Sequence, residues 1–174
     1  DASSSEPVVD AALALDTGRL RAALDASTER LGVEETIRLA ILPAMREIGS
    51  RWRAGRSDVG REHLATEGVR SWLARQAFLA PPPFRPRPIV LACGPQDLHT
   101  IGLESFAVLL ARRGWPCRVL GARTPTEALV SAVQAMEAIG AVVTAQRSVT
   151  RRSAMEAIAA ADALPGVRAF YAGN

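Results

Sequence analysis

A proline run near the middle of this chain divides it into two halves that no single helix or strand can join. Residues 81–88 read Pro-Pro-Pro-Phe-Arg-Pro-Arg-Pro, with four prolines among the first six positions. Proline lacks a backbone N–H and its ring fixes φ, so such a run ends a helix and favours a stiff, extended spacer. We therefore predict a domain boundary here, with residues 81–88 as a Pro-rich linker.

The half before this linker has the apolar periodicity of amphipathic helices. We expect four helices over residues 8–15, 17–31, 33–52 and 57–78. Pro43 should kink the third helix, and Ser57 should cap the fourth. Because the loops between them are short, residues 8–80 predict an antiparallel four-helix bundle. Residues 1–7, Asp-Ala-Ser-Ser-Ser-Glu-Pro, have a linker composition, and we expect the chain to be part of a longer protein.

The half after the linker alternates short apolar runs with helical patterns. Strands are expected over residues 89–93, 117–120, 141–144 and 167–171, with helices over 103–113, 124–139 and 153–164. Thr124 followed by Pro125 is the expected start of the second helix. This alternation predicts a doubly wound α/β domain with a parallel sheet over residues 89–174. We expect that domain to be C-terminally incomplete, because the sequence stops just after a strand.

Composition narrows the classes of function. The chain has 174 residues, 48% of them hydrophobic, but no apolar run of transmembrane length and no signal peptide pattern. We therefore expect a cytoplasmic protein that makes no membrane contact. All 21 basic residues are arginines, scattered among acidic residues, and the net charge is only +3. Any contact with DNA is thus expected through a separate domain outside this chain.

One histidine motif lies where an α/β sheet binds ligands. Asp97-Leu98-His99-Thr100-Ile101-Gly102 follows the first expected strand and precedes a helix. Open α/β sheets bind ligands at the carboxyl ends of their strands, so His99 is a candidate metal ligand there. The carboxylate of Asp97 is placed to hold the second ring nitrogen and to fix the tautomer.

This Asp-x-His-x-x-Gly motif, within a helical bundle, a proline spacer and an α/β domain, resembles the cobalamin-binding module of methionine synthase, corrinoid carriers and CarH/LitR-type light-sensing transcriptional regulators. The resemblance implies that His99 is the lower axial ligand of cobalt, with Asp97 behind it. It implies that Gly102 lets the helix start approach the corrin. It also implies that Thr144 and Gly173 lie beside the nucleotide tail, although the family's Ser-x-Leu reads Thr-Ala-Gln here and its Gly-Gly reads Ala172-Gly173.

A second motif, in the helical half, resembles the cap of adenosylcobalamin photoreceptors. Trp52 is followed after nine residues by Glu62-His63. The resemblance implies that Trp52, Val59 and Glu62 line the upper face of the cofactor. It also implies that His63 binds cobalt as the upper axial ligand after photolysis.

We therefore expect an adenosylcobalamin-binding photoreceptor module, not an enzyme, whose bundle shifts in the light and changes a dimer or tetramer. Two alternatives remain open. One is a corrinoid methyl carrier of a methyltransferase system, against which the Glu62-His63 pair speaks. The other is a photoreceptor that binds a bilin, such as biliverdin, in addition to cobalamin.

Overall fold

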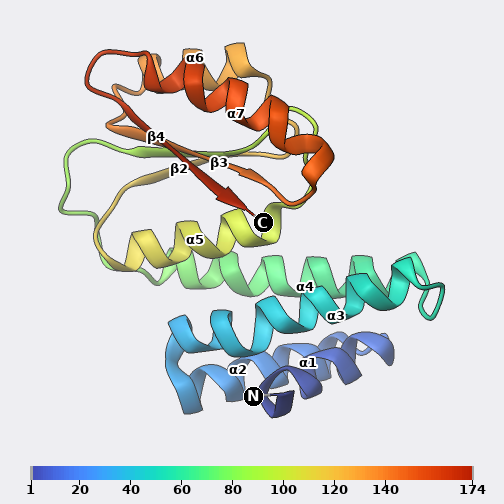
Figure 1. Cartoon of the computed structure of the whole chain (residues 1–174). Helices are drawn as coiled ribbons and strands as arrows, with labels where there is room; N and C mark the ends of the chain where they lie inside the picture. Colours follow the sequence, from blue (N-terminus) through green and yellow to red (C-terminus); the bar gives the residue numbers. More distant parts are fainter. Residues whose placement is uncertain (1, 174) are drawn as a thin grey trace. The chain divides into compact units, whose positions relative to one another are not determined.

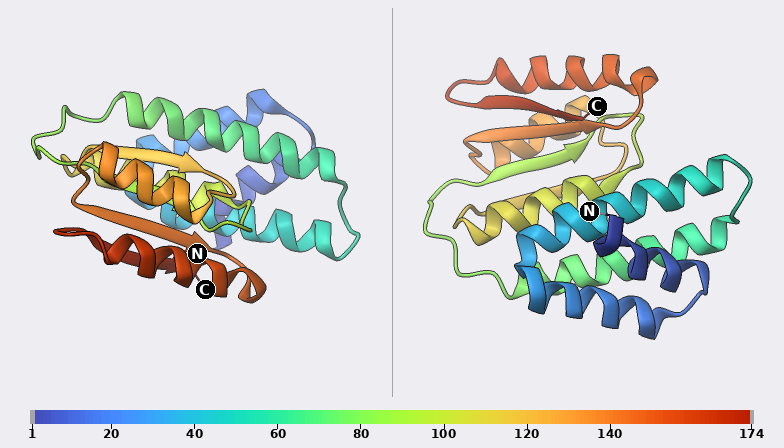
Figure 2. Two further views of the ribbon diagram at one scale, coloured as in Figure 1. Left: turned by 90° about the horizontal axis from the view of Figure 1, so that it is seen from above. Right: turned by 60° about the horizontal axis from the view of Figure 1, so that its bottom comes forward.

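The structure is a computed structural model that describes residues 2–173, and these residues form two compact units (Figures 1 and 2). The first unit ends at Phe78 and the second begins at Leu79. No helix among the described residues is both long and apolar enough to cross a membrane.

The first unit is entirely helical. Its elements are α1 (Ala2–Leu13), α2 (Thr17–Glu35), the π-helix η1 (Thr36–Ile41), α3 (Leu42–Arg53) and α4 (Val59–Phe78). Large aliphatic side chains from every element form its core and are at most 2% exposed: Val8, Leu20, Leu24, Ile37, Ile41, Ile48, Val69 and Leu73. The helical periodicity of the sequence therefore does mark the face that each helix buries.

The first helix starts earlier than its composition predicts. Residues 2–7 belong to α1, whereas the sequence suggested a linker, and Pro7 lies inside the helix. The Ser4 side chain is buried, and its hydroxyl oxygen accepts a hydrogen bond from the guanidinium of Arg30 on α2 at 3.3 Å. Packing against α2 thus outweighs the low helix propensity of a serine-rich segment.

The middle of the bundle shows how a glycine and a proline are accommodated. Gly32 has φ +80°, a value that residues other than glycine rarely adopt. Its non-helical backbone interrupts α2 at the boundary that the sequence predicts between two helices. Pro43 lies in the first turn of α3, directly after η1. Instead of a simple kink, the chain makes π-type bonds before Pro43, and the Leu42 N–H donates to the Ile37 carbonyl. Proline has no backbone N–H to donate, and the switch to π-type hydrogen bonds just before it lets the helix continue.

The start of α4 is capped one residue later than expected. Asp58, not Ser57, accepts the backbone N–H of Arg61 with its carboxylate Oδ1, at 3.1 Å. The hydroxyl of Ser57 is buried without a hydrogen-bond partner. The carboxylate also favours this position because it lies near the positive end of the helix dipole.

The second unit is a four-stranded parallel sheet with helices on both faces. The strands are β1 (Ile89–Cys93), β2 (Cys117–Gly121), β3 (Gly140–Ala145) and β4 (Arg168–Gly173), in the spatial order β2-β1-β3-β4. The helices are α5 (Thr100–Arg112), α6 (Thr126–Ala135) and α7 (Ser148–Asp162). The doubly wound α/β fold predicted from the sequence is confirmed.

The two faces of the sheet have separate apolar cores. On one face, Leu91, Cys93 and Val142 pack against Leu103 of α5. On the other face, the alternate residues of β1 and β3 pack against α6 and α7 (Figure 1). The chain therefore leaves β1 toward one side of the sheet and leaves β3 toward the other. The carboxyl ends of the neighbouring strands β1 and β3 therefore form a topological switch point, the place where such folds bind ligands.

The helix boundaries in this unit differ from the sequence predictions at several ends. Helix α6 begins at Thr126 and ends at Ala135, short of Ile139, because Glu137 has a left-handed φ of +50°. Thr124 does not cap α6; its hydroxyl donates to the Gly121 carbonyl at 3.2 Å. Helices α5 and α7 instead start earlier than predicted, at Thr100 and Ser148.

The Pro-rich segment forms neither helix nor strand, and part of it is anchored on the second unit. The backbone N–H of Phe84 donates to the Gly114 carbonyl at 3.2 Å. The guanidinium of Arg85 lies 4.1 Å from the centre of the Trp115 ring, within range of a cation–π interaction. The Pro-rich segment is therefore attached to the second unit from Phe84 onward.

Candidate functional site

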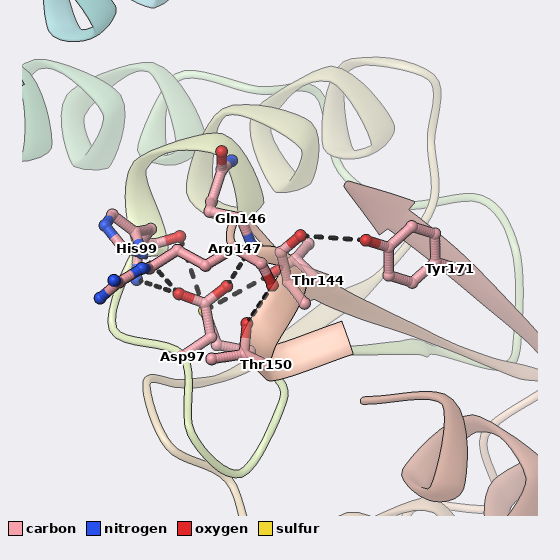
Figure 3. A network of polar contacts seen from close by, with 9 residues as sticks. Asp97, His99, Thr144, Gln146, Arg147, Thr150 and Tyr171 are labelled. Carbon is pink, nitrogen blue, oxygen red and sulfur yellow. Dashed lines mark hydrogen bonds and ion pairs between the residues drawn. The ribbon is translucent and has the colours of Figure 1, made fainter. Parts of the chain in front are cut away.

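The Asp97–His99 loop is the centre of the candidate site (Figure 3). It follows β1 at the switch point, and Cys93 at the end of β1 is in register with Thr144 of β3. The loop is tied to the strand ends by main-chain bonds: Gly94 donates to the Thr144 carbonyl at 2.9 Å, and Asp97 donates to the Gly94 carbonyl at 2.9 Å. The position of the loop is therefore set by the sheet.

Asp97 is a buried carboxylate that holds the histidine. Its side chain is 0% exposed, whereas that of His99 is 53% exposed. Oδ1 of Asp97 lies 2.6 Å from Nδ1 of His99 and accepts the His99 backbone N–H at 3.0 Å. The ring is thus oriented by a partner that water does not reach.

The second oxygen of Asp97 is held by the end of β3. The backbone N–H of Gln146 donates to Oδ2 at 2.6 Å. Burial raises the pKa of Asp97, but the hydrogen bonds from the His99 side chain and from the backbone of His99 and Gln146 outweigh it, so the pKa is lowered overall. The carboxylate is therefore held ionised beside the imidazole.

This geometry fits a single imidazole ligand to a metal. An ionised carboxylate next to Nδ1 favours the tautomer with the proton on Nδ1, which leaves the lone pair on Nε2. His99 is the N-cap residue of α5 but makes no capping bond with its side chain. The predicted contact between Asp97 and His99 is confirmed. Among residues 2–173, no group of three His, Cys, Asp or Glu side chains is arranged to hold a metal ion.

Gly102 lies in the first turn of α5. A Cβ at this position would meet only the side-chain Nε2 of Gln146, at an ordinary contact distance of 3.5 Å. Packing among the described residues therefore does not demand a glycine at position 102. That a corrin approaches the helix start here stays a prediction.

Thr144 and Gly173 have roles within the protein that the sequence does not reveal. Thr144 is 7% exposed, and its hydroxyl donates to the Cys93 sulfur at 3.5 Å. At Gly173, a Cβ would lie 2.3 Å from the Ala145 carbonyl oxygen and 2.5 Å from the Tyr171 hydroxyl. Close approach of β4 to β3 thus explains Gly173, and contact of either residue with a nucleotide tail stays a prediction.

The second motif lies at one end of the helical unit, on α3 and α4. Trp52 and Val59 are 48% and 47% exposed. His63 is 71% exposed and its Nε2 lies 3.7 Å from Glu62 Oε2, while Oε1 of Glu62 accepts the Thr66 hydroxyl at 2.9 Å. These side chains therefore do not serve the helical core. That they face the cofactor stays a prediction.

Sequence reasoning missed the main-chain donors of the site. The backbone N–H of Gln146 binds the Asp97 carboxylate, and the backbone N–H of Arg123 donates to the Asp97 carbonyl at 2.8 Å. No side-chain pattern marks such donors, because any residue except proline supplies one. Arg147, Arg151 and Arg152 are exposed around the start of α7.

Comparisons with known proteins identify the family of the chain, without testing the individual site residues. Residues 5–75 match the model of a family described as B12 binding domain. The chain is 39% identical over 121 residues to the HTH-type transcriptional repressor CarA of Myxococcus xanthus, covering 68% of this chain and 40% of CarA. It is 33% identical over 145 residues to the repressor CarH of the same organism, covering 82% of this chain and 48% of CarH. The chain thus spans less than half the length of these two relatives.

A solved structure shows the same fold. The monomethylamine corrinoid protein of Methanosarcina barkeri superposes with a TM-score of 0.71 at 13% identity, over 98% of this chain and 84% of that protein. At this identity the likeness concerns the fold alone. Together with the sequence matches, it places the chain in the class of cobalamin-binding modules. The chain belongs to the B12-binding family, in the form found in CarA and CarH.

Proposed function

We propose that this chain is the adenosylcobalamin-binding sensor module of a transcriptional regulator, with His99 as the lower axial ligand of cobalt. The observation that carries the proposal is the pair of buried Asp97 and half-exposed His99 at the switch point of the sheet. The pair offers one oriented imidazole nitrogen to a metal that brings its remaining ligands with it, as cobalt in a corrin does. CarA and CarH are named as repressors, which supports a regulatory role over an enzymatic one.

The exposed residues of the helical unit are proposed to form the upper side of the site. Trp52, Val59 and Glu62 would shield the upper ligand of the cofactor. When bound, adenosylcobalamin supplies a cobalt–carbon bond that visible light breaks. His63, which is 71% exposed and whose Nε2 lies 3.7 Å from Glu62 Oε2, would reorient and offer a second imidazole nitrogen.

The proposed output is a change of assembly. A shift of the helical unit relative to the α/β unit would alter the surface available for contact between copies of the chain. We propose a homo-oligomer, a dimer or a tetramer, that differs between darkness and light. DNA would be bound by a separate domain outside this chain.

The test is an absorption spectrum of the chain loaded with adenosylcobalamin, in darkness and after green light. The wild type should change its bands, and His63→Ala should give a different light product. Ser71→Ala, an exposed position on the same helix, is the matched control and should behave as the wild type. If the bands do not change in the light, or if they change identically in His63→Ala, the sensor proposal is wrong.

The same sample distinguishes the sensor from the two alternative functions. A corrinoid methyl carrier would exchange methyl groups between methylcobalamin and a methyltransferase, and its spectrum would not depend on His63. A bilin bound in addition would turn the purified protein green or blue, whereas cobalamin alone gives red to orange. Light scattering before and after illumination tests the proposed change of oligomer.

A further inference from the structure

Two separate links join the end of β3 to His99. The first runs from the Gln146 backbone through the Asp97 carboxylate to the imidazole. The second runs through a buried thiol. Thr144 Oγ1 donates to Cys93 Sγ at 3.5 Å, and Cys93 Sγ donates to the His99 carbonyl oxygen at 3.7 Å.

The thiol lies where it acts on the backbone of the ligand loop. Cys93 is the last residue of β1, it is 0% exposed, and it packs in the core beneath α5. Asp97 fixes the ring and the N–H of His99, while Cys93 contacts the carbonyl at the point where the loop becomes α5. Both ends of the His99 residue are therefore held by buried groups.

The thiol is suited to act as a donor. An ordinary cysteine thiol keeps its proton at neutral pH, so Sγ has a hydrogen to donate. Sulfur hydrogen bonds are weak, so the contact adjusts the His99 position instead of fixing the fold.

We propose that Cys93 is a positioning residue for His99, and that Thr144, Cys93 and His99 form a relay that couples the end of β3 to the cobalt-binding imidazole. The proposal rests on the proposed role of His99 as cobalt ligand. It gives Thr144 a function that does not require contact with the nucleotide tail. The relay would keep the imidazole in the orientation that binds cobalt.

The test uses cobinamide in the cobalt(II) state, which carries no nucleotide tail and no internal base. Electron paramagnetic resonance of the loaded chain then reports the axial nitrogen, and labelling the histidines with ¹⁵N changes the splitting only if that nitrogen is an imidazole. The wild type should show the ¹⁵N-dependent splitting, and His99→Ala should lack it. If the label has no effect in the wild type, the proposed ligand role of His99 fails, whatever Cys93 does.

Given an imidazole signal, Cys93→Ala should lower the equilibrium constant for imidazole ligation about two- to tenfold, the effect of one neutral hydrogen bond. Cys93→Ser keeps a donor and should recover most of the loss. Cys117→Ala is the matched control, because Cys117 packs against the same core but donates to the Trp115 carbonyl. It should leave the constant unchanged.

Thr144→Val keeps the side-chain shape, creates no cavity at Cys93 and removes the first donor of the relay. It should weaken ligation of cobinamide in the same direction as Cys93→Ala. Urea unfolding of the unloaded variants shows whether each one is folded. The relay is refuted if Cys93→Ala ligates as the wild type does, if serine and alanine are equally impaired, or if Thr144→Val has no effect.

Discussion

Replacing Asp97 by asparagine tests the electrostatic core of the site. The buried carboxylate accepts three hydrogen bonds: the His99 N–H at 3.0 Å, the His99 ring at 2.6 Å and the Gln146 N–H at 2.6 Å. An asparagine amide keeps one oxygen and places an NH₂ group at the other position. If that oxygen stays toward His99, the NH₂ group faces the Gln146 N–H, so that two donors meet without an acceptor.

The magnitude follows from the lost contact. A hydrogen bond to a charged group contributes about 1.5–3 kcal/mol, so Asp97→Asn should lower the unfolding free energy of the unloaded chain by about 2–3 kcal/mol at pH 7. Asp162→Asn is the matched control in the same unit, since Asp162 is exposed and accepts only the Ala169 N–H at 2.8 Å. Its cost should stay below about 1 kcal/mol. Loss of the partner of a metal-binding histidine should also weaken cobalamin binding about 10- to 100-fold.

The pH dependence gives a second measure of the same contacts. Because the pKa of Asp97 is lower in the folded chain than in the unfolded chain, the stability it contributes is present above about pH 4. That stability is lost as the pH falls through the folded-state pKa. The difference between the wild type and Asp97→Asn should therefore shrink below about pH 4.

The assay is urea unfolding followed by circular dichroism, with hydrogen exchange to assign the transition to the α/β unit. A difference under about 0.5 kcal/mol at pH 7 would mean that the carboxylate contacts do not stabilise the loop. If the difference in unfolding free energy between the wild type and Asp97→Asn stays constant between pH 7 and pH 3, the charge of Asp97 does not stabilise the loop.

Three further substitutions test other local arguments. Asp58→Ala should cost about 1 kcal/mol of unfolding free energy, whereas Ser57→Ala should be close to neutral, because Asp58 alone accepts a helix N–H; urea unfolding distinguishes them, and equal costs would contradict the cap assignment. Gly102→Ala should leave the unloaded chain as stable or slightly more stable, yet weaken cobalamin binding in a titration, and unchanged binding would show that nothing approaches the helix start there. Gly32→Ala should cost about 1–2 kcal/mol because of the φ of +80°, measured as a lower melting temperature, and a neutral result would mean that the break in α2 relaxes freely.

The fold was largely predictable from periodicity. Apolar spacing located the helices of the first unit and the strands of the second, because burial of one face is the main source of stability for both. Helix ends were predicted less well. Residues 2–7 are helical through contacts with α2, and Pro43 is preceded by a π-helix because the core holds both sides of the break. Local composition contains neither fact.

The site was predictable where side chains carry it. The spacing of Asp97 and His99 predicted their hydrogen bond, since two residues apart on a loop are close whatever the rest of the chain does. The second support of Asp97 comes from Gln146, which is 49 residues away in the sequence. A backbone donor has no residue type to recognise, so only the pairing of β1 with β3 reveals it.

The sequence by itself determined the two kinds of unit, the proline segment near their boundary, and the histidine motif at the end of the first strand. Tertiary structure decided which faces of the sheet the helices cover, and thereby where the switch point lies. It also decided that Thr144 turns its hydroxyl toward Cys93 and that only glycine fits at position 173. These last features depend on distances between strands that are far apart in the chain, and such distances are set by packing in the folded protein.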